Sequence, residues 1–273
     1  MNMRLFGTAI LIMYLCSSVT LAIAPLGTPT SEIETGRWSI GADYSRSEID
    51  LRLEDAQGTS FFTANKAEKV RFDLVLGKIG YGICENWDVF VGLGASKAKY
   101  KNVNSYMDAG SFEQELVDYE SDTGFVTEVG TKTTFYEKDN LKIGGMVQLS
   151  WLNLDGTYKE ASWTDGVFND SGEGDLDADI IVVQAAPGVS YQLYENLSVY
   201  GGPFWQWIDG DGEADGKTGS ASGEGGKGDI KEDSSFGGWV GLKAELYKNL
   251  TCNVEFQATC SSNTLGIGIA AKF

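Results

Sequence analysis

A row of acidic residues late in the chain is the sharpest chemical pattern in the sequence. Residues 209–216 read "DGDGEADG", so carboxylates recur at every second position: Asp209, Asp211, Glu213 and Asp215. Carboxylate oxygens at this spacing are typical of calcium-binding loops. Such a loop also needs Gly at its sixth position and Glu at its twelfth, where this chain has Ala214 and Ser220. The pattern therefore predicts a weak divalent-cation site at most, and no other cofactor.

The absence of histidine limits the chemistry available to the chain. The sequence has no His among its 273 residues. Histidine is the side chain that most often takes the proton from a catalytic hydroxyl or water, so a nucleophile here would lack its usual base. An arrangement of Asp and Lys is the remaining alternative. We therefore predict that the protein is not an enzyme and has no catalytic residue.

One short pattern recurs four times and predicts a repeated turn. Each copy has Tyr or Cys, then charged residues that end in Asn, then Leu or Trp and a run of alternating apolar residues. Asn tolerates a left-handed backbone better than other non-Gly residues, so each copy predicts a tight turn with Asn in that conformation. The copies are "GICENWDVFVG" (82–92), "TFYEKDNLKIGG" (134–145), "QLYENLSVYGG" (192–202) and "AELYKNLTCNV" (244–254).

Long polar segments alternate with these turns and predict loops at the opposite end of the fold. They are rich in Gly, Asp, Glu and Ser, and they span 54–67, 101–122, 157–178 and 209–233. The runs that join turns and loops are apolar at every second residue, which is the period of a β-strand. Ten strands are predicted: 37–53, 68–83, 87–100, 123–136, 141–156, 179–194, 197–208, 234–247, 250–260 and 263–273.

Aromatic residues stand at both ends of the apolar runs. Ten residue steps separate Leu141 from Trp151, and ten separate Leu197 from Trp207. At about 3.3 Å per step and a tilt near 40°, ten steps cover roughly 25 Å, the height of the lipid-facing band of a membrane barrel. A soluble barrel would turn its apolar face inward and would have no need of paired aromatic belts. The runs predict an all-β, antiparallel up-and-down transmembrane β-barrel of about ten strands over residues 36–273.

The C-terminus carries a family signal. "TLGIGIAAKF" ends the chain on Phe273, with the apolar residues Leu265, Ile267, Ile269 and Ala271 on one face. In this alternation and its final aromatic residue the sequence resembles the bacterial outer-membrane β-barrel proteins. The resemblance implies that Phe273 is read by the outer-membrane assembly machinery. It also implies a location in the outer membrane, with the short turns in the periplasm and the long acidic loops outside the cell.

The resemblance bears on catalysis as well. Omptin-like proteases, outer-membrane phospholipases and lipid A acyl-modifying barrels resemble one another in needing an active-site His, which this chain lacks. The last strand is expected to close the barrel by pairing 263–273 with 37–47, because an unpaired strand in hydrocarbon would leave its backbone polar groups unsatisfied.

Residues 1–22 predict a cleaved signal peptide. Arg4 is the only charge, "LFGTAILIMYL" is an apolar core too short for a mature membrane helix, and small residues precede the cut after Ala22. Residues 23–35 would then form a short periplasmic lead. The net charge of −18 argues against nucleic-acid binding, because phosphates would repel the chain.

Strand alternation assigns a set of charged residues to the lumen, where we expect them to pair with one another. A ten-stranded barrel is narrow and its side chains fill much of the interior. Two interpretations remain open: a lumen closed by salt-bridged side chains, and a small polar channel. Bulky inward residues such as Phe90 and Trp239 favour the closed lumen. The predicted lumen charges are Asp43, Arg71, Asp73, Glu128, Lys132, Lys243, Glu245 and Glu255, with Asp88, Lys142 and Lys272.

These features predict a non-catalytic integral outer-membrane protein that is structural or weakly pore-forming. The alternative is a surface adhesin or ligand-binding protein that acts through its acidic loops. The expected partners are outer-membrane lipid, the assembly machinery and a surface ligand that the sequence does not identify.

Overall fold

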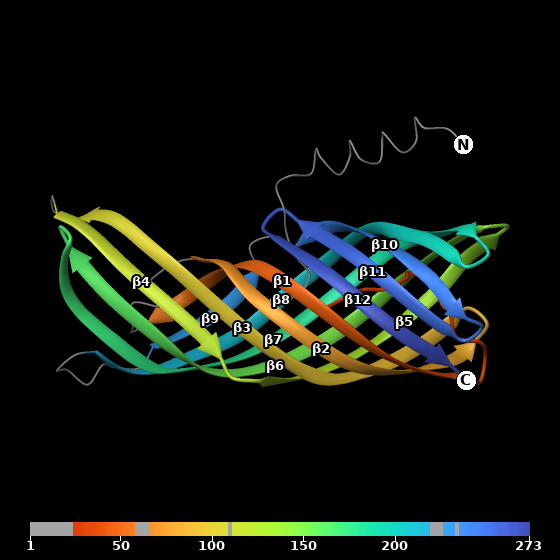
Figure 1. Ribbon diagram of the computed structural model, residues 1–273, viewed down its shortest axis with the longest axis horizontal. Coiled ribbons are helices and arrows are strands. Elements are labelled where there is room, and N and C mark those ends of the chain that lie inside the picture. Colours follow the sequence, from red (N-terminus) through yellow and green to blue (C-terminus); the bar gives the residue numbers. More distant parts are fainter. Residues whose placement is uncertain (1–23, 58–65, 109–110, 219–225, 233–234) are drawn as a thin grey trace, which may run out of the picture.

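The computed structural model describes residues 24–57, 66–108, 111–218, 226–232 and 235–273. Over these residues the chain is all-β, and its long antiparallel strands wrap into one barrel (Figure 1). No helix among the described residues is long and apolar enough to cross a membrane. The strands are β1 (Trp38–Gln57), β2 (Lys66–Cys84), β3 (Trp87–Asp108), β4 (Ser111–Ser121), β5 (Gly124–Lys138), β6 (Leu141–Thr164), β7 (Val167–Tyr194), β8 (Leu197–Thr218), β9 (Gly226–Glu232), β10 (Phe236–Tyr247), β11 (Leu250–Thr259) and β12 (Ser262–Lys272).

The described strands fill ten places in the barrel wall. β4 and β5 follow one another in a single place between β3 and β6. In the same way β9 and β10 share one place beside β8. β12 pairs with β1 from Ser39 opposite Lys272 to Ile49 opposite Ser262, and this pairing closes the barrel. The predicted ten-stranded wall and its closure by the C-terminal strand are both confirmed.

The four repeated patterns form the turns at one end of the barrel, which we call the turn end. Each is a two-residue turn that ends in the predicted Asn. The predicted left-handed Asn is wrong, because the described non-Gly residues with positive φ are Lys69, Asp139 and Asp165. The turn Asn residues instead accept a backbone hydrogen bond from the strand beside the outgoing one. The pairs, with N···O distances, are Thr134 to Asn86 (2.8 Å), Gln192 to Asn140, Glu245 to Asn196 and Lys272 to Asn249 (2.9 Å each). Each turn thus adds one backbone hydrogen bond between neighbouring strands at the rim of the barrel.

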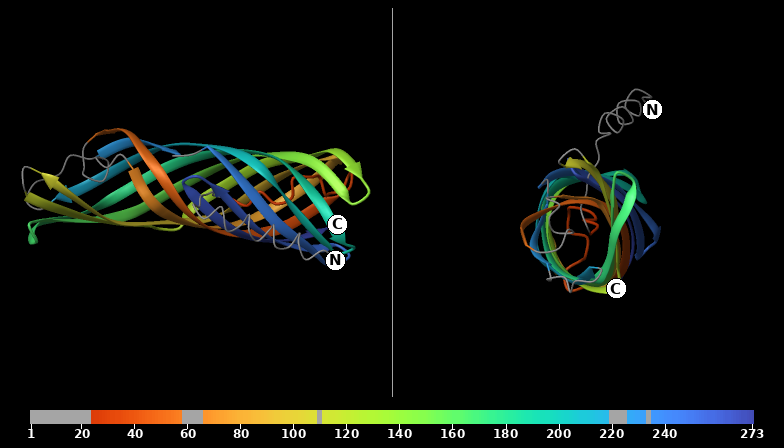
Figure 2. Two further views of the ribbon diagram at one scale, coloured as in Figure 1. Left: turned by 90° about the horizontal axis from the view of Figure 1, so that it is seen from above. Right: turned by 90° about the vertical axis from the view of Figure 1, so that its left-hand side faces the viewer.

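At the opposite end the predicted long loops are largely strands. Described parts of 101–122, 157–178 and 209–233 belong to β3, β4, β6, β7, β8 and β9, and β7 alone runs for 28 residues. The loop prediction is therefore wrong for these residues. The physical reason is that the segments alternate as well: residues 175–180 read "DLDADI", with apolar side chains at every second place. We call this part of the wall the outer extension (Figures 1 and 2).

The barrel loses two strands on the way into the outer extension. The β11–β12 hairpin ends at residues 260–261, while β1 and β9 continue past it. Above the hairpin β1 pairs directly with β9, beginning with Leu51 opposite Glu232. The wall there is closed by a different set of neighbours from those nearer the turn end.

The outer face near the turn end is an apolar band between two aromatic belts, as predicted. Ile79 and Val91, which are cross-strand partners, expose 46% and 53% of their surface in the middle of this band. The exposed aromatic residues nearer the turns are Trp38, Trp87, Phe135, Tyr136, Tyr191, Tyr194, Tyr247 and Phe273. Those at the far edge of the band are Phe125, Trp151, Trp205, Trp207 and Phe236. Exposed apolar side chains in so wide a band match a lipid-facing wall.

Candidate functional site

The strands exchange their polar and apolar faces where the apolar band ends. Within the band β7 exposes Ile181 and buries Gln184. Beyond the band the same strand exposes Asp177 and buries Leu176 and Ile180. The outer extension is therefore built like a soluble barrel, with an apolar interior and a charged surface. Its buried side chains form one cluster, the outer core, which includes Ile49, Phe72, Leu74, Leu152, Ile180, Ile208 and Ile230.

Three amides lie just below the outer core. Gln148, Gln184 and Gln206 are cross-strand neighbours on β6, β7 and β8, and each is at least 99% buried. Gln148 Nε2 donates to Gln184 Oε1 at 2.6 Å. Buried polar side chains of this kind suit the lumen of a membrane barrel, whose inward face is polar. These three Gln residues mark the level at which the lumen changes from polar to apolar.

The lower lumen holds the N-terminal segment of the described chain. Residues 24–33, which we call the plug, run inside the ring of strands (Figure 2). Ala24 and Leu26 are each 1% exposed and Ile33 is 8% exposed. The prediction that residues 23–35 form a periplasmic lead is therefore wrong for the plug. The reason is that the wall offers buried carboxylates to its backbone N–H groups.

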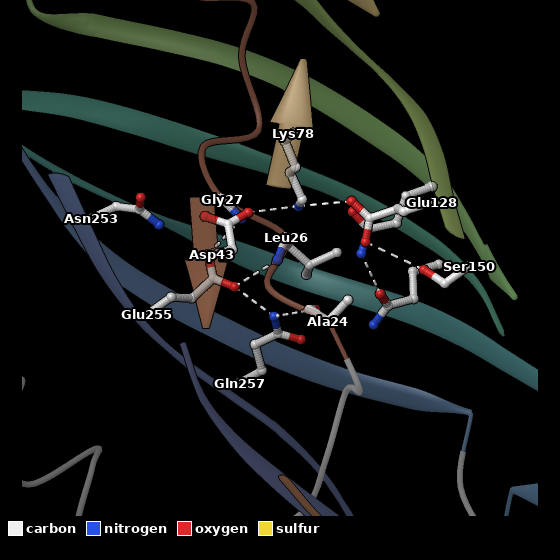
Figure 3. A network of polar contacts seen from close by, with 12 residues as sticks. Ala24, Leu26, Gly27, Asp43, Lys78, Glu128, Ser150, Asn253, Glu255 and Gln257 are labelled. Atoms are coloured by element: carbon white, nitrogen blue, oxygen red, sulfur yellow. Dashed lines mark hydrogen bonds and ion pairs between the residues drawn. The ribbon is translucent and has the colours of Figure 1, made fainter. Parts of the chain in front are cut away.

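One end of the plug is held by β11. Leu26 N and Gly27 N each donate to one oxygen of the Glu255 carboxylate at 2.8 Å (Figure 3). Gln257 Nε2 donates to the carbonyl oxygen of Ala24 at 3.1 Å and also to Glu255. Glu255 and Gln257 are fully buried. A buried carboxylate with three donors is well satisfied, since hydrogen bonds to a charged acceptor are the strong ones.

The other end of the plug is held by three further strands. Glu32 N and Ile33 N both donate to Asp88 Oδ2 on β3, at 2.8 and 3.3 Å. Ser31 N donates to Thr134 Oγ1 on β5 at 3.1 Å. The Glu32 carboxylate forms an ion pair with Lys243 on β10. Every hydrogen bond and ion pair described for the plug is thus made with a side chain of the wall.

A three-residue ion network lies on one side of the lumen beside the plug. Lys78 on β2 lies 2.8 Å from Asp43 on β1 and 2.7 Å from Glu128 on β5 (Figure 3). Ser150 Oγ donates to the second oxygen of Glu128 at 3.3 Å. The side chain of Glu128 is fully buried, and those of Lys78 and Asp43 are 16% and 17% exposed. One ammonium on β2 therefore links β1 to β5, across the Gly92 position of β3.

Two cavities flank the plug. One of about 130 Å³ is lined by Leu26, Gly27, Asp43, Lys78 and Lys132, among others. The second, of about 290 Å³, is lined by turn residues including Asn140 and Asn196 and so lies at the turn end. Glu32, Lys243 and Lys272 line both cavities. The plug is therefore approached from the turn end.

No protein-family model matches the chain. No curated protein matches it either. Solved structures do. The outer-membrane protease OmpT from Escherichia coli superposes with a TM-score of 0.52 at 11% identity, covering 86% of this chain and 97% of that one. The outer-membrane protein OprG from Pseudomonas aeruginosa gives a TM-score of 0.39 at 13% identity, covering 88% and 97%. The attachment invasion locus protein Ail of Yersinia pestis gives 0.25 at 12%, covering 88% and 99%.

The chain has the fold of a bacterial outer-membrane β-barrel. Identities this low carry the fold alone, so the activity of the protease is not transferred with it. The outer-membrane barrels that match include a protease and proteins described without an enzymatic activity. The sequence has no His among its 273 residues.

Within this outer-membrane barrel most of the predicted lumen charges face the lumen. Asp43, Glu128 and Glu255 belong to the networks described above, and so do Asp88 and Lys243. They pair with Lys78 and the plug rather than mainly with one another, so the predicted partners are largely wrong. The pairing partners Lys78 and Glu32 were missed. The signal for Lys78 is its position on the same strand face as the buried Leu76.

Four further predicted lumen charges lie at the rim or beside Phe90. Lys132 makes no ion pair with another described residue, and its ammonium lies 5.7 Å from the centre of the Phe90 ring. Glu245 is exposed and lines the cavity at the turn end with Lys272. Lys142 pairs at 2.8 Å with Glu137, near the same rim.

Two of the predicted lumen residues are on the outer wall. Arg71 pairs with Glu48 at 3.3 Å and Asp73 with Arg46 at 2.7 Å, and these side chains are 28–56% exposed. The prediction fails because Arg71 and Asp73 lie beyond the apolar band, where the outward face is the polar one. The inward residues there are apolar, such as Phe72.

The predicted cation loop is a strand. Asp209, Asp211, Glu213 and Asp215 lie on the outward face of β8. Alternate residues on a strand are about 6.6 Å apart, so their carboxylates do not converge on one ion. Among the described residues no group of three or more His, Cys, Asp or Glu is arranged to hold a metal. The calcium-loop prediction is wrong in its geometry.

These acids belong to a larger acidic face on β6, β7 and β8. Asp177 lies opposite Asp155 on one side and Glu213 on the other. Asp175 lies opposite Asp215, and Asp179 opposite Asp211. Burial and the neighbouring carboxylates, chiefly Asp155 and Asp175, raise the pKa of Asp177 above its ordinary value. Carboxylates that face each other across strands repel, so this face is not built for the stability of the sheet.

Proposed function

We propose that the protein is a closed, non-catalytic outer-membrane barrel that holds a rigid acidic extension outside the cell. The observation that carries the proposal is the filling of the lumen at two levels. The plug occupies the half within the membrane, and the outer core occupies the half beyond it.

The two fillings differ in kind, and this favours a closed barrel over a weak pore. The plug is a polar, hydrogen-bonded insert that is approached from the turn end. The outer core is apolar and includes Leu76, Leu152 and Ile208, which are all fully buried. An ion that passed the plug would still have to cross this apolar layer, where a charge loses its hydration. The interpretation of the lumen as a small channel is therefore the weaker one.

The experiment is a conductance measurement on refolded protein in a planar lipid bilayer. We expect no regular conductance steps, because both halves of the lumen are filled. A general porin in the same bilayer is the positive control, and heat-modifiability on a gel confirms that the sample is folded. Regular steps from the folded protein that disappear after boiling would contradict a closed barrel.

A second candidate function is binding of a cationic partner by the acidic face. The specific observation in its favour is the repulsion between opposed carboxylates, which a cationic partner would relieve. The test compares binding of a soluble polycation by the wild type and by Asp175→Asn/Asp177→Asn/Asp179→Asn, at low and high salt. Equal binding by the two proteins would count against this candidate.

A further inference from the structure

The plug is bound in the way that a receptor binds a peptide. Among the described residues, 24–33 contain no strand pairing with the wall. Five backbone N–H groups of the plug, from Leu26, Gly27, Ser31, Glu32 and Ile33, instead donate to wall side chains. Contacts to backbone groups are available to any extended peptide, so the sequence of the plug is not their main determinant.

The acceptors form a site that is fixed by the barrel. Glu255, Asp88 and Thr134 stand on three different strands and are 0%, 3% and 8% exposed. Each strand is hydrogen-bonded on both sides, so the spacing of the acceptors is set by the wall. Burying a carboxylate without hydrogen-bond donors costs free energy. The carboxylates of Glu255 and Asp88 therefore need N–H donors at these points.

Three positions of the plug add sequence requirements. Leu26 packs in a buried cluster with Phe90 and Trp239. Gly27 has a φ of +70°, a conformation that other L-residues rarely adopt. Glu32 forms the ion pair with Lys243. The site therefore favours an apolar residue followed by Gly and, five positions after the Gly, an acidic residue.

We infer that the lower lumen is a peptide-binding site, that the protein's own residues 24–33 occupy it as a ligand, and that it accepts an extended peptide of the same pattern supplied from the turn end. The cavity of about 290 Å³ between the turns and Glu32 provides the approach. The inference goes beyond the closed barrel, because exchange of the plug leaves the wall residues of the outer core in place. A failure to bind peptide therefore leaves the conductance result unaffected.

The first test unseats the plug without altering the wall. In the full-length mature protein, Gly27→Leu/Glu32→Lys strains the backbone and places an ammonium beside Lys243. The probe is a fluorescent synthetic peptide, "APLGTPTSEIET" (residues 24–35), and anisotropy reports its binding. The matched control is the same peptide carrying the same two substitutions.

We expect the unsubstituted peptide to bind the variant at least about 10-fold more tightly than the control peptide. Adding Glu255→Gln to the variant should weaken its binding by about 10-fold, since two hydrogen bonds lose their charged acceptor. Equal affinity for the two peptides, or no effect of Glu255→Gln, would overturn the inference.

A second test uses a protein close to the wild type and applies even if the first variant fails to fold. Ser31, which is 7% exposed, is replaced by Cys after Cys84, Cys252 and Cys260 are changed to Ser. A water-soluble maleimide then reports whether the plug is seated. We expect excess unsubstituted peptide to displace the plug and to raise the labelling rate at least about 10-fold, while the control peptide does not. A labelling rate that the peptide does not change would mean that the plug is a permanent part of the fold.

Discussion

Removal of the Lys78 ammonium would test how far the barrel depends on its lumen network. Lys78→Met leaves a side chain of similar length but strands the carboxylates of Asp43 and Glu128, which lie 2.8 and 2.7 Å from the ammonium. Because the Glu128 side chain is fully buried, no solvent replaces the lost partner. Breaking a buried ion pair in this way costs about 3–5 kcal/mol. We expect the free energy of unfolding to fall by that amount.

The assay is urea unfolding in lipid vesicles, followed by Trp fluorescence and by the heat-modifiable band on a gel. Arg71→Met is the matched control, because it breaks an ion pair with Glu48 on the outer wall where both side chains are almost half exposed. Exposed pairs contribute about 0–1 kcal/mol, so this variant should unfold almost as the wild type does. The double variant Lys78→Met/Glu128→Gln should recover part of the loss, since it removes one stranded charge. Equal losses for Lys78→Met and Arg71→Met would refute the reasoning.

Three further perturbations address other parts of the molecule. Asp177→Asn should raise the free energy of unfolding at neutral pH by roughly 0.2–1 kcal/mol. Because the folded pKa of Asp177 is raised, the wild type gains stability as the pH falls through that pKa, and the variant should lose this gain; a pH series of melting curves tests it. Gly130→Val places a Cβ against the Phe90 ring and should destabilise by about 1–3 kcal/mol in the same urea assay. Deleting Phe273 removes its 2.9 Å hydrogen bond to the Trp38 carbonyl and should lower the amount of heat-modifiable protein in the outer membrane; unchanged amounts would contradict this.

The parts of the fold that the sequence predicts are those that depend on one local rule. The period of two locates the strands within the apolar band, and the turn pattern locates the four short turns. Closure follows from the need to pair every strand edge in hydrocarbon. These features need no knowledge of what lies across the lumen.

The plug was missed because its determinants are spread over the whole chain. Residues 24–35 read "APLGTPTSEIET", with two Pro and no alternation, and nothing in them predicts an ordered position. Order comes from Asp88, Thr134, Lys243 and Glu255, which stand on four different strands. Hydrogen bonds between residues more than 200 positions apart, as for Leu26 and Glu255, leave no local pattern in the sequence.

The misplaced lumen charges have another cause, and it also explains the length of the strands. A rule that sends polar side chains inward holds only where the outer face meets lipid. Beyond the band the outer face meets water, so the rule reverses and Arg71 points outward while Phe72 fills the interior. The alternation continues without a break across this boundary, which is why "DLDADI" can be both acidic and part of a strand. The level at which the outward residues of β7 change from Ile181 to Asp179 therefore fixes the depth of the barrel in the membrane, and the inward residues change from Gln184 to Ile180 at the same level. It also gives the outer extension a core of its own, so that its acidic face is held rigidly at the membrane surface.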